Sequence, residues 1–171
     1  QGEKKDGVCE WYDIEGYALD KYVAEQGEFL TNKIKNMIVE NPDIINKQKK
    51  DIIYVISPFK NVAYQLSKEL NKIEFTRYDK KGKPTNIGTV HTFQGKEAPI
   101  VFFVLGADKK CIGAANWAVG TDNPNIMNVA VTRAKEEFYI IGDKEMYLSL
   151  NSDVINDTCK IIEKHNMNTS L

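Results

Sequence analysis

One stretch of the sequence concentrates polar side chains that suit phosphate and ribose groups. Residues 89–97 read Thr-Val-His-Thr-Phe-Gln-Gly-Lys-Glu and lie just before the most apolar run of the chain. Hydroxyls and exposed backbone N–H groups bind phosphate oxygens, and a glycine such as Gly95 lets a ligand approach the backbone. A carboxylate such as Glu97 can accept a hydrogen bond from a ribose hydroxyl. The alternative is purely structural, with Thr89 and His91 as strand residues and Gly95 in a turn.

A second stretch, residues 124–135, ends an apolar helical pattern with an arginine. Ile126, Ala130 and Arg133 are spaced to share one face of a predicted helix that begins near Asn123 and runs to about Lys135. Because a buried arginine needs an anionic partner, a guanidinium at the end of an apolar stripe suits a phosphate. A snorkelling side chain or an internal ion pair is the alternative interpretation.

Two weaker signals lie elsewhere in the chain. Ser57-Pro58-Phe59-Lys60 follows an apolar run, and a hydroxyl and an ammonium flank the turn that Pro58 imposes. By itself this pattern is more typical of a strand–helix turn with a capping polar group. Trp117 lies in the turn-rich residues 108–124, where it either stacks on a base or packs this stretch onto the domain.

These segments must be positioned by apolar runs that alternate with amphipathic helices. Continuous apolar runs typical of strands buried on both faces occupy residues 52–56, 100–105 and 138–142, and residues 87–93 alternate weakly as a further strand. Helical spacing marks residues 29–38, 61–73 and 154–165. The pattern predicts an α/β fold with a mostly parallel sheet and helices on both faces. In such sheets ligands gather at the carboxyl ends of the strands.

The composition predicts one globular domain and excludes several classes of protein. The chain has 171 residues, of which 42% are hydrophobic and 27% charged. A net charge of −1 excludes a polybasic protein that holds nucleic acid by bulk charge, but not a local basic groove. The 3 cysteines form no C-x-x-C pair, which argues against a zinc site or a disulfide-rich scaffold and predicts a reducing, cytoplasmic setting. No apolar run is long enough for a membrane span, and a start at Gln1 predicts a piece excised from a longer protein.

Taken together, the three motifs resemble those of superfamily 1 helicases. Residues 89–97 are similar to motif V, and residues 128–135 (Asn-Val-Ala-Val-Thr-Arg-Ala-Lys) match the motif VI pattern N-V-A-x-T-R-A-[RK]. Residues 57–60 resemble the segment associated with motif IV. The order of the motifs matches as well, and the resemblance covers about residues 9–147. It is closest to the subgroup that resembles the nonsense-mediated-decay helicase and its bacterial relatives.

The resemblance implies an α/β, RecA-like P-loop NTPase-type domain with three layers, and it assigns roles to single residues. Arg133 would be the arginine finger, a catalytic residue that reaches the γ-phosphate of ATP and stabilises charge during phosphoryl transfer. Gln94, Gly95 and Glu97 would lie with Arg133 near the nucleotide. The contacts to nucleic acid would come from Ser57, Lys60, Thr89, His91 and Thr92. No metal ligand is expected in this chain.

The motifs that grip the β-phosphate and magnesium in this family do not occur in the chain. There is no G-x-x-x-x-G-K-[ST] phosphate loop and no D-E-x-x sequence, and the Gly82-Lys83 pair lacks the upstream glycine and precedes Pro84. We therefore interpret residues 1–171 as a single domain, the second RecA-like domain of the motor. The first motor domain, upstream and absent from this chain, would supply most contacts to ATP and Mg²⁺. This fragment alone is expected not to hydrolyse ATP.

The expected function is the second motor half of an ATP-dependent helicase or translocase that acts on single-stranded nucleic acid, with DNA favoured over RNA. The expected partners are that strand and the upstream RecA-like domain, with no membrane. The alternative is a non-catalytic RecA-like binding or interaction module with vestigial motifs. The retained Gln94, Glu97 and Arg133 argue against this alternative, since decay would be expected to remove such polar residues early. A phosphate loop upstream in the parent protein would favour the motor.

Overall fold

A parallel sheet of five strands forms the centre of the molecule, which a computed structural model describes for residues 7–119 and 125–151. The strand order is β1-β7-β6-β4-β5, and every neighbouring pair is parallel. The strands are β1 (Val8–Asp13), β4 (Ile53–Ile56), β5 (Ile87–Gly88), β6 (Ala98–Val104) and β7 (Ala134–Gly142). A separate antiparallel hairpin pairs β2 (Ala18–Leu19) with β3 (Tyr22–Val23).

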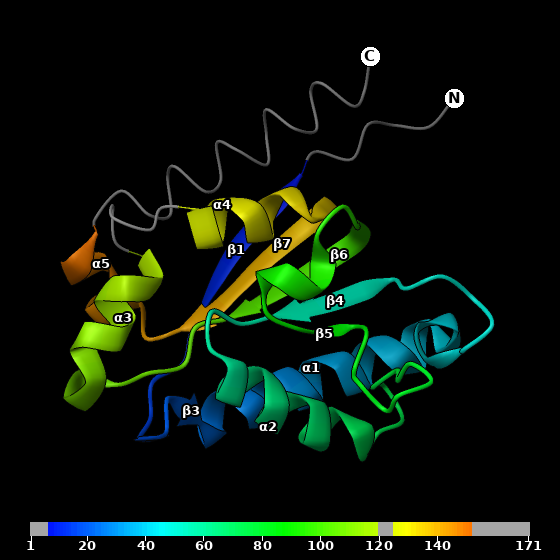
Figure 1. The fold of residues 1–171 in the computed structure, drawn as a ribbon, viewed down its shortest axis with the longest axis horizontal. Coiled ribbons are helices and arrows are strands. Elements are labelled where there is room, and N and C mark those ends of the chain that lie inside the picture. The colour runs from blue at the N-terminus through cyan, green and yellow to red at the C-terminus, as the bar shows by residue number, and fades with distance from the viewer. Residues whose placement is uncertain (1–6, 120–124, 152–171) are drawn as a thin grey trace.

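Helices cover both faces of the sheet (Figure 1). On one face lie α1 (Ala24–Glu40) and α2 (Lys60–Asn71), and on the other α4 (Asn125–Thr132) packs on β6 and β7. The helices α3 (Ile112–Val119) and α5 (Lys144–Leu150) pack against each other. Three 3₁₀ turns complete the described elements: η1 (Pro42–Ile45), η2 (Val90–Phe93) and η3 (Lys109–Cys111). The predicted α/β, RecA-like fold with helices on both faces of a mostly parallel sheet is confirmed.

The core is built around β6, which lies between β4 and β7 and is buried on both faces. Val101, Phe102 and Phe103 have no exposed surface, as the continuous apolar pattern predicts for such a strand. The predicted helical spacing in α2 is also confirmed, because Val62 and Leu66 are fully buried against this core. None of the described helices has the length and apolar character that crossing a membrane requires.

The strand predicted at residues 87–93 is wrong beyond its first two residues. Only Ile87 and Gly88 pair with β4, and Val90–Phe93 forms the turn η2. The chain turns because the Thr92 N–H donates to the Thr89 carbonyl oxygen (3.0 Å). The turn also brings the Thr92 side chain so close to Gly88 that a Cβ at Gly88 would lie 2.3 Å from Thr92 Oγ1. The polar residues of this segment are therefore presented on a turn rather than on a strand.

The helix predicted to run to Lys135 ends earlier, at Thr132. The Thr132 hydroxyl donates to the Val129 carbonyl oxygen (2.7 Å), and the Arg133 N–H reaches back three residues to the Ala130 carbonyl oxygen (3.1 Å). From Arg133 onward the backbone pairs with β6, since the Ala98 N–H donates to the Arg133 carbonyl oxygen (2.9 Å). Arg133 thus lies at a helix–strand junction, and not on the face of a helix as the spacing predicted.

Several elements of the structure were not predicted from the sequence, and one predicted helix is not described. The strand β1 pairs with β7 at one edge of the sheet, and its residues are only partly buried, so its apolar pattern is weak. The stretch 108–124, which the sequence suggested to be irregular, contains η3 and α3 up to Val119. The helix predicted at residues 154–165 lies outside the described residues.

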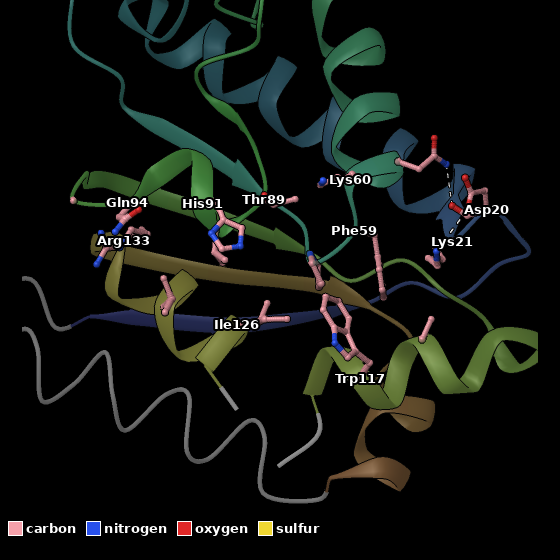
Figure 2. Close-up of a pocket in the computed structure, with 16 residues that line it drawn as sticks. Asp20, Lys21, Phe59, Lys60, Thr89, His91, Gln94, Trp117, Ile126 and Arg133 are labelled. Carbon is pink, nitrogen blue, oxygen red and sulfur yellow. Dashed lines mark hydrogen bonds and ion pairs between the residues drawn. The ribbon is translucent and has the colours of Figure 1, made fainter. Parts of the chain in front are cut away.

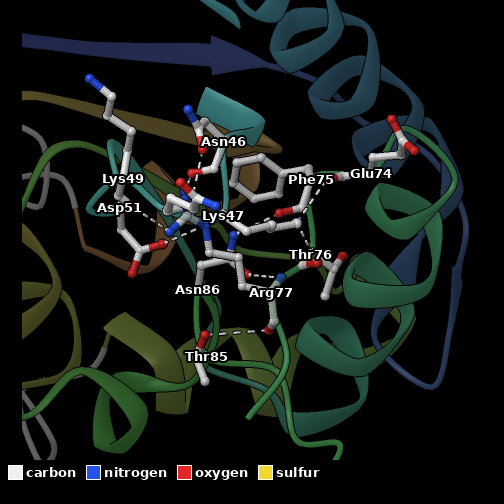
Figure 3. Close-up of polar contacts among 11 residues, drawn as sticks. Asn46, Lys47, Lys49, Asp51, Glu74, Phe75, Thr76, Arg77, Thr85 and Asn86 are labelled. Carbon is white, nitrogen blue, oxygen red and sulfur yellow. Dashed lines mark hydrogen bonds and ion pairs between the residues drawn. The ribbon is translucent and has the colours of Figure 1, made fainter. Parts of the chain in front are cut away.

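A polar network holds the connection between α2 and β5 (Figure 3). The Arg77 guanidinium donates to the backbone carbonyl oxygens of Asn46 (2.8 Å) and Lys49 (2.6 Å). Its Nε lies 3.2 Å from a carboxylate oxygen of Asp51. Burial raises the pKa of Asp51, and the charge of Arg77 opposes this shift. The Asn86 side chain accepts from the Arg77 backbone N–H (2.9 Å), which places the chain directly before β5.

The β2–β3 hairpin is held against the chain that follows β6. The Asp108 carboxylate accepts from the Ala18 N–H (2.7 Å), and the Ala107 N–H donates to the Lys21 carbonyl oxygen (2.7 Å). The turn residues Asp20 and Lys21 have φ values of 47° and 68°, in the left-handed region that residues with a Cβ rarely adopt. These tethers keep a strained turn in one position.

We expect Gly88→Ala to lower the free energy of unfolding by about 1–3 kcal/mol, because the new methyl group overpacks the contact with Thr92. Urea unfolding followed by circular dichroism measures the change. Gly113→Ala in α3 is the matched control, since a Cβ there would meet nothing within 4 Å. The control should be as stable as the parent or slightly more stable. Equal stability of Gly88→Ala and the parent would contradict the close packing of β5 on η2.

We expect Asp108→Ala to lower the free energy of unfolding by about 1–2 kcal/mol at neutral pH, because two backbone donors lose their acceptor. The backbone N–H of Ala18, followed by other donors, lowers the pKa of Asp108. Its stabilising effect is therefore complete above the unfolded-state pKa of about 3.9 and is lost as the pH falls through the folded-state pKa.

Urea titrations of parent and variant at a series of pH values measure this effect. The difference between them should shrink in acid, and a difference that stays constant at every pH would contradict the role of the carboxylate. Asp43→Ala is the control, because its ion pair with Lys49 spans 3.9 Å between half-exposed side chains. That substitution should change stability by less than about 0.5 kcal/mol.

Candidate functional site

A cleft with a volume of about 1210 Å³ brings most of the predicted site residues together (Figure 2). At one end it reaches Phe59 and Lys60, just after the carboxyl end of β4, and at the other it reaches Arg133, just before the amino end of β7. The structure therefore corrects the expectation that the candidate residues gather only at the carboxyl ends of the strands. The register of the parallel strands places them along a path from one end of the sheet to the other.

Arg133 lies at the amino end of the cleft in an unusual environment for a half-buried cation. Its Nη1 donates to the Phe93 carbonyl oxygen (3.2 Å) and its Nη2 to the Thr132 hydroxyl (3.2 Å), whereas its buried Nε has no hydrogen-bond partner. Within the described part of the chain, no carboxylate forms an ion pair with Arg133. The guanidinium is thus oriented by two neutral oxygens, and its charge has no neutralising partner there.

The Arg133 charge also acts on its surroundings. Burial, and then the charge of Asp51, raise the pKa of Tyr54, and Arg133 opposes this shift. Tyr54 packs on Phe93 with 4.5 Å between the ring centroids. The same Phe93 supplies the carbonyl oxygen that orients Arg133, so the aromatic contact and the arginine contact support each other.

Gln94 and Gly95 line the cleft beside Arg133, with which the resemblance groups them. Both are exposed, and Gly95 has a φ of 72° that favours glycine at this position. A Cβ at Gly95 would meet nothing within 4 Å, so the backbone there faces open space. Glu97, assigned to the same group of residues, is exposed and lies outside the residues that line the cleft.

Three of the five residues predicted to contact nucleic acid line the carboxyl-end part of the cleft, namely Lys60, Thr89 and His91. The side chains of Lys60 and His91 are exposed. Lys60 begins α2, whose N-cap residue Phe59 makes no side-chain capping hydrogen bond. The first-turn N–H groups of α2 therefore add partial positive charge beside the Lys60 ammonium.

The other two residues of this group have structural surroundings. Ser57 has no exposed surface, and its Oγ accepts a hydrogen bond from the Phe59 N–H (3.2 Å). Thr92 is half-buried, outside the cleft lining, and packs beside Gly88. The structure thus gives Ser57 the turn-forming role that its sequence pattern also allowed. A phosphate could reach its buried hydroxyl only after a rearrangement.

The structure adds cleft residues that the sequence motifs did not include. Asp20 and Lys21 come from the β2–β3 turn, and Ala114 and Trp117 come from α3. Nothing in the spacing of these residues relates them to the motifs, because they are brought in by tertiary contacts. One such contact is the hydrogen bond from the Asn61 side chain to the Asp20 carbonyl oxygen (2.9 Å).

The cleft combines an apolar wall with cationic ends. Ile126 and Val129 of α4 continue the wall that α3 begins. The cationic side chains are Lys21 and Lys60 at the carboxyl end and Arg133 at the amino end, and Asp20 is the single acidic residue among the described residues that line it. Such a lining favours a ligand that carries both apolar rings and negative charge.

Two comparisons with known proteins relate this chain to a family. The sequence profile of the AAA domain family matches residues 14–145. Helicase sen1 of Schizosaccharomyces pombe is 30% identical over 130 residues, which cover 74% of this chain and 7% of that protein. The chain thus corresponds to a small part of that relative. From the profile match, the sequence identity and the parallel sheet, we conclude that the chain belongs to the AAA domain family and is a superfamily 1 helicase-like domain.

Proposed function

We propose that this chain is the second motor domain of an ATP-dependent superfamily 1 helicase or translocase. In this role it supplies Arg133 as the arginine finger and part of the surface that binds single-stranded nucleic acid, with DNA favoured over RNA. We further propose that it belongs to the subgroup of the nonsense-mediated-decay helicase, as a bacterial-type relative, and that it acts in the cytoplasm. The similarity to helicase sen1 supports the motor assignment, although it covers only 7% of that protein.

The observation that carries the proposal is the state of the Arg133 guanidinium. Two neutral oxygens orient it, its Nε is buried without a hydrogen-bond partner, and no described carboxylate pairs with it. A buried or half-buried guanidinium gains most from a bidentate anionic partner such as a phosphate. Its place beside Gln94 and the open backbone of Gly95 leaves room for such a partner at the amino end of the cleft.

The residues present fit a nucleotide that is shared with a second domain. ATP would be held mainly by the first motor domain, together with Mg²⁺, and would meet this chain at Arg133, Gln94 and Gly95. Glu97 lies two residues after Gly95 and is exposed, and a ribose hydroxyl would be a suitable donor to it. When bound, ATP supplies the phosphoryl group whose transfer to water drives the motor. The part of this chain is to place a positive charge where negative charge develops.

The strand would be held at the opposite end of the cleft. Lys60 and the uncapped N-terminus of α2 offer positive charge for a backbone phosphate, and Thr89 and His91 offer hydrogen bonds to the same backbone. Ser57 and Thr92 would support this surface by shaping the two turns that carry it. Because the same domain carries both ends, closure of the motor on ATP would move the strand surface together with Arg133.

We expect Arg133→Ala in the full-length protein to reduce strand-stimulated ATP hydrolysis by about 10³–10⁵-fold, because the transition-state charge loses its stabilising cation. A coupled ATPase assay with single-stranded DNA and, separately, RNA measures the rate. Strand affinity, followed by fluorescence anisotropy, should stay within about threefold of the parent, since rim charges at a distance contribute little.

Two further variants make the test specific. Arg133→Lys keeps the charge but loses the planar fork, and it should recover only a small part of the rate. Lys68→Ala, at an exposed position of α2 outside the cleft, is the control and should hydrolyse ATP at the parent rate. Normal ATP turnover by Arg133→Ala would overturn the arginine-finger assignment and would favour the non-catalytic module.

A further inference from the structure

We propose that Trp117, Phe59 and Lys21 form a subsite for one nucleotide unit of a single strand, with the base stacked on the Trp117 indole and a phosphate on the Lys21 ammonium. This inference rests on the proposed strand-binding function of the chain. It extends that function to Lys21 of the β2–β3 turn and Trp117 of α3, which lie outside the helicase-like motifs. The third residue, Phe59, is the N-cap of α2 and belongs to the motif IV-like segment, but no role in strand contact or hydrolysis is assigned to it above.

The aromatic part of the subsite is a supported, exposed indole. Trp117 is 47% exposed, whereas Phe59 below it is only 7% exposed. Their ring centroids lie 5.8 Å apart with the planes inclined at 35°, a range in which aromatic pairs attract. Both rings line the cleft (Figure 2). Phe59 therefore fixes the indole from one side and leaves a large apolar surface of Trp117 available to a planar ligand.

The exposure of the Trp117 indole inside a cleft distinguishes a surface that binds a ligand from one that only packs α3 onto the domain. A tryptophan that only anchors α3 to the domain would be almost fully buried, as the neighbouring Ala115 and Ala118 are on the same helix. The wall beside it consists of Ala114 and Ile126, which offer no polar group to a partner. A nucleobase has the flat apolar faces that such a surface accepts regardless of its sequence.

The cationic part of the subsite is held by a strained turn. Lys21 has a φ of 68°, and its carbonyl oxygen accepts from the Ala107 N–H (2.7 Å). The preceding Asp20 has a φ of 47°, and its carbonyl oxygen accepts from the Asn61 side chain (2.9 Å). Unfavourable backbone held by tethers from two other segments is a feature of binding and catalytic sites.

The strained turn places the Lys21 ammonium over the Phe59 ring of this aromatic pair. Its Nζ lies 5.6 Å from the centroid of the Phe59 ring. The nearest carboxylate, that of Asp20, lies 3.7 Å away and is 70% exposed, so its screening by water leaves the ammonium available to a phosphate. Lys60 lines the cleft at the same end and can bind the next phosphate along the strand.

The spacing of the two ends also favours a strand here. The subsite lies at the carboxyl end of the cleft, while Arg133, Gln94 and Gly95 lie at its amino end. The strand and the nucleotide would therefore not compete for the same cations. A base stacked on Trp117 would also oppose sliding of the strand along the domain, because the base would first have to leave the indole.

The test measures binding of a 15-nucleotide oligothymidylate, a matched oligoribouridylate and an abasic strand of the same length to the 171-residue chain at low salt. Affinity is followed by anisotropy of a labelled strand, and stacking by quenching of tryptophan fluorescence. We expect quenching with both base-containing strands and none with the abasic strand. We expect Trp117→Ala to weaken binding of the base-containing strands by about 5- to 100-fold, and Trp117→Phe by less.

The role of Lys21 is tested by a separate measurement, the salt dependence of strand affinity. Lys21→Ala should weaken all three strands, the abasic one included, and should reduce the slope of log affinity against log salt by about 0.7. Lys21→Arg should keep most of the affinity. Tyr64→Ala and Lys68→Ala are the controls, since Tyr64 is 58% exposed on α2 and neither residue lines the cleft. Both controls should bind as the parent does.

The outcomes separate this inference from the function on which it rests. Strand binding without quenching, and unchanged in Trp117→Ala, would overturn the subsite and leave the motor assignment standing. Failure of the parent chain to bind any strand, together with strand-independent ATP hydrolysis by the full-length protein, would overturn both. Equal quenching by free adenosine nucleotide and by oligothymidylate would assign the indole to a mononucleotide and would also overturn the proposal.

Discussion

The pairing of β6 with β7 is the constraint on which the rest of the molecule depends. The register sets Ala98 opposite Ala134, and the Ala98 N–H donates to the Arg133 carbonyl oxygen (2.9 Å). Because β6 is buried on both faces, a shift of this register would move Phe102 and Phe103 out of the spaces that they fill in the core. The residues directly before β6 and the residues directly before β7 are therefore brought together. They meet at the amino end of the cleft, where Gln94, Gly95 and Arg133 lie.

The two ends of the cleft are positioned by different kinds of structure. The amino end is fixed by strand register and by the hydrogen bond from Arg133 to the Phe93 carbonyl oxygen. The carboxyl end depends on the β2–β3 hairpin, which forms a separate two-stranded sheet and is held by Asp108, Ala107 and Asn61. A hairpin held by a few hydrogen bonds can adjust more easily than a strand in a buried sheet. Such a difference suits a domain in which chemistry needs a fixed cation and the strand must be released.

Most of the fold could be predicted from the sequence, and the errors have specific physical causes. The buried strands and the spacing of α2 are local signals, and the structure confirms them. The predicted strand at residues 87–93 is wrong because only two of its residues pair with β4, and the next residues form a turn between Thr89 and Thr92. The predicted helix end at Lys135 is wrong because the backbone pairs with β6 from Arg133 onward. In the first case a local turn forms where no further strand pairing is available, and in the second a non-local contact overrides a local preference.

By itself, the sequence determined the α/β class, the apolar strands and the identity of the polar residues that suit phosphate chemistry, since burial and residue type are encoded locally. Only the tertiary structure decided that Gln94, Gly95 and Arg133 share a cleft while Glu97 and Thr92 lie outside its lining. It also decided that Ser57 is buried in its turn and that Lys21 and Trp117, separated by almost a hundred residues, flank the same ring of Phe59. These relations arise from sheet register and from tethers between distant segments, and no spacing within one segment encodes them.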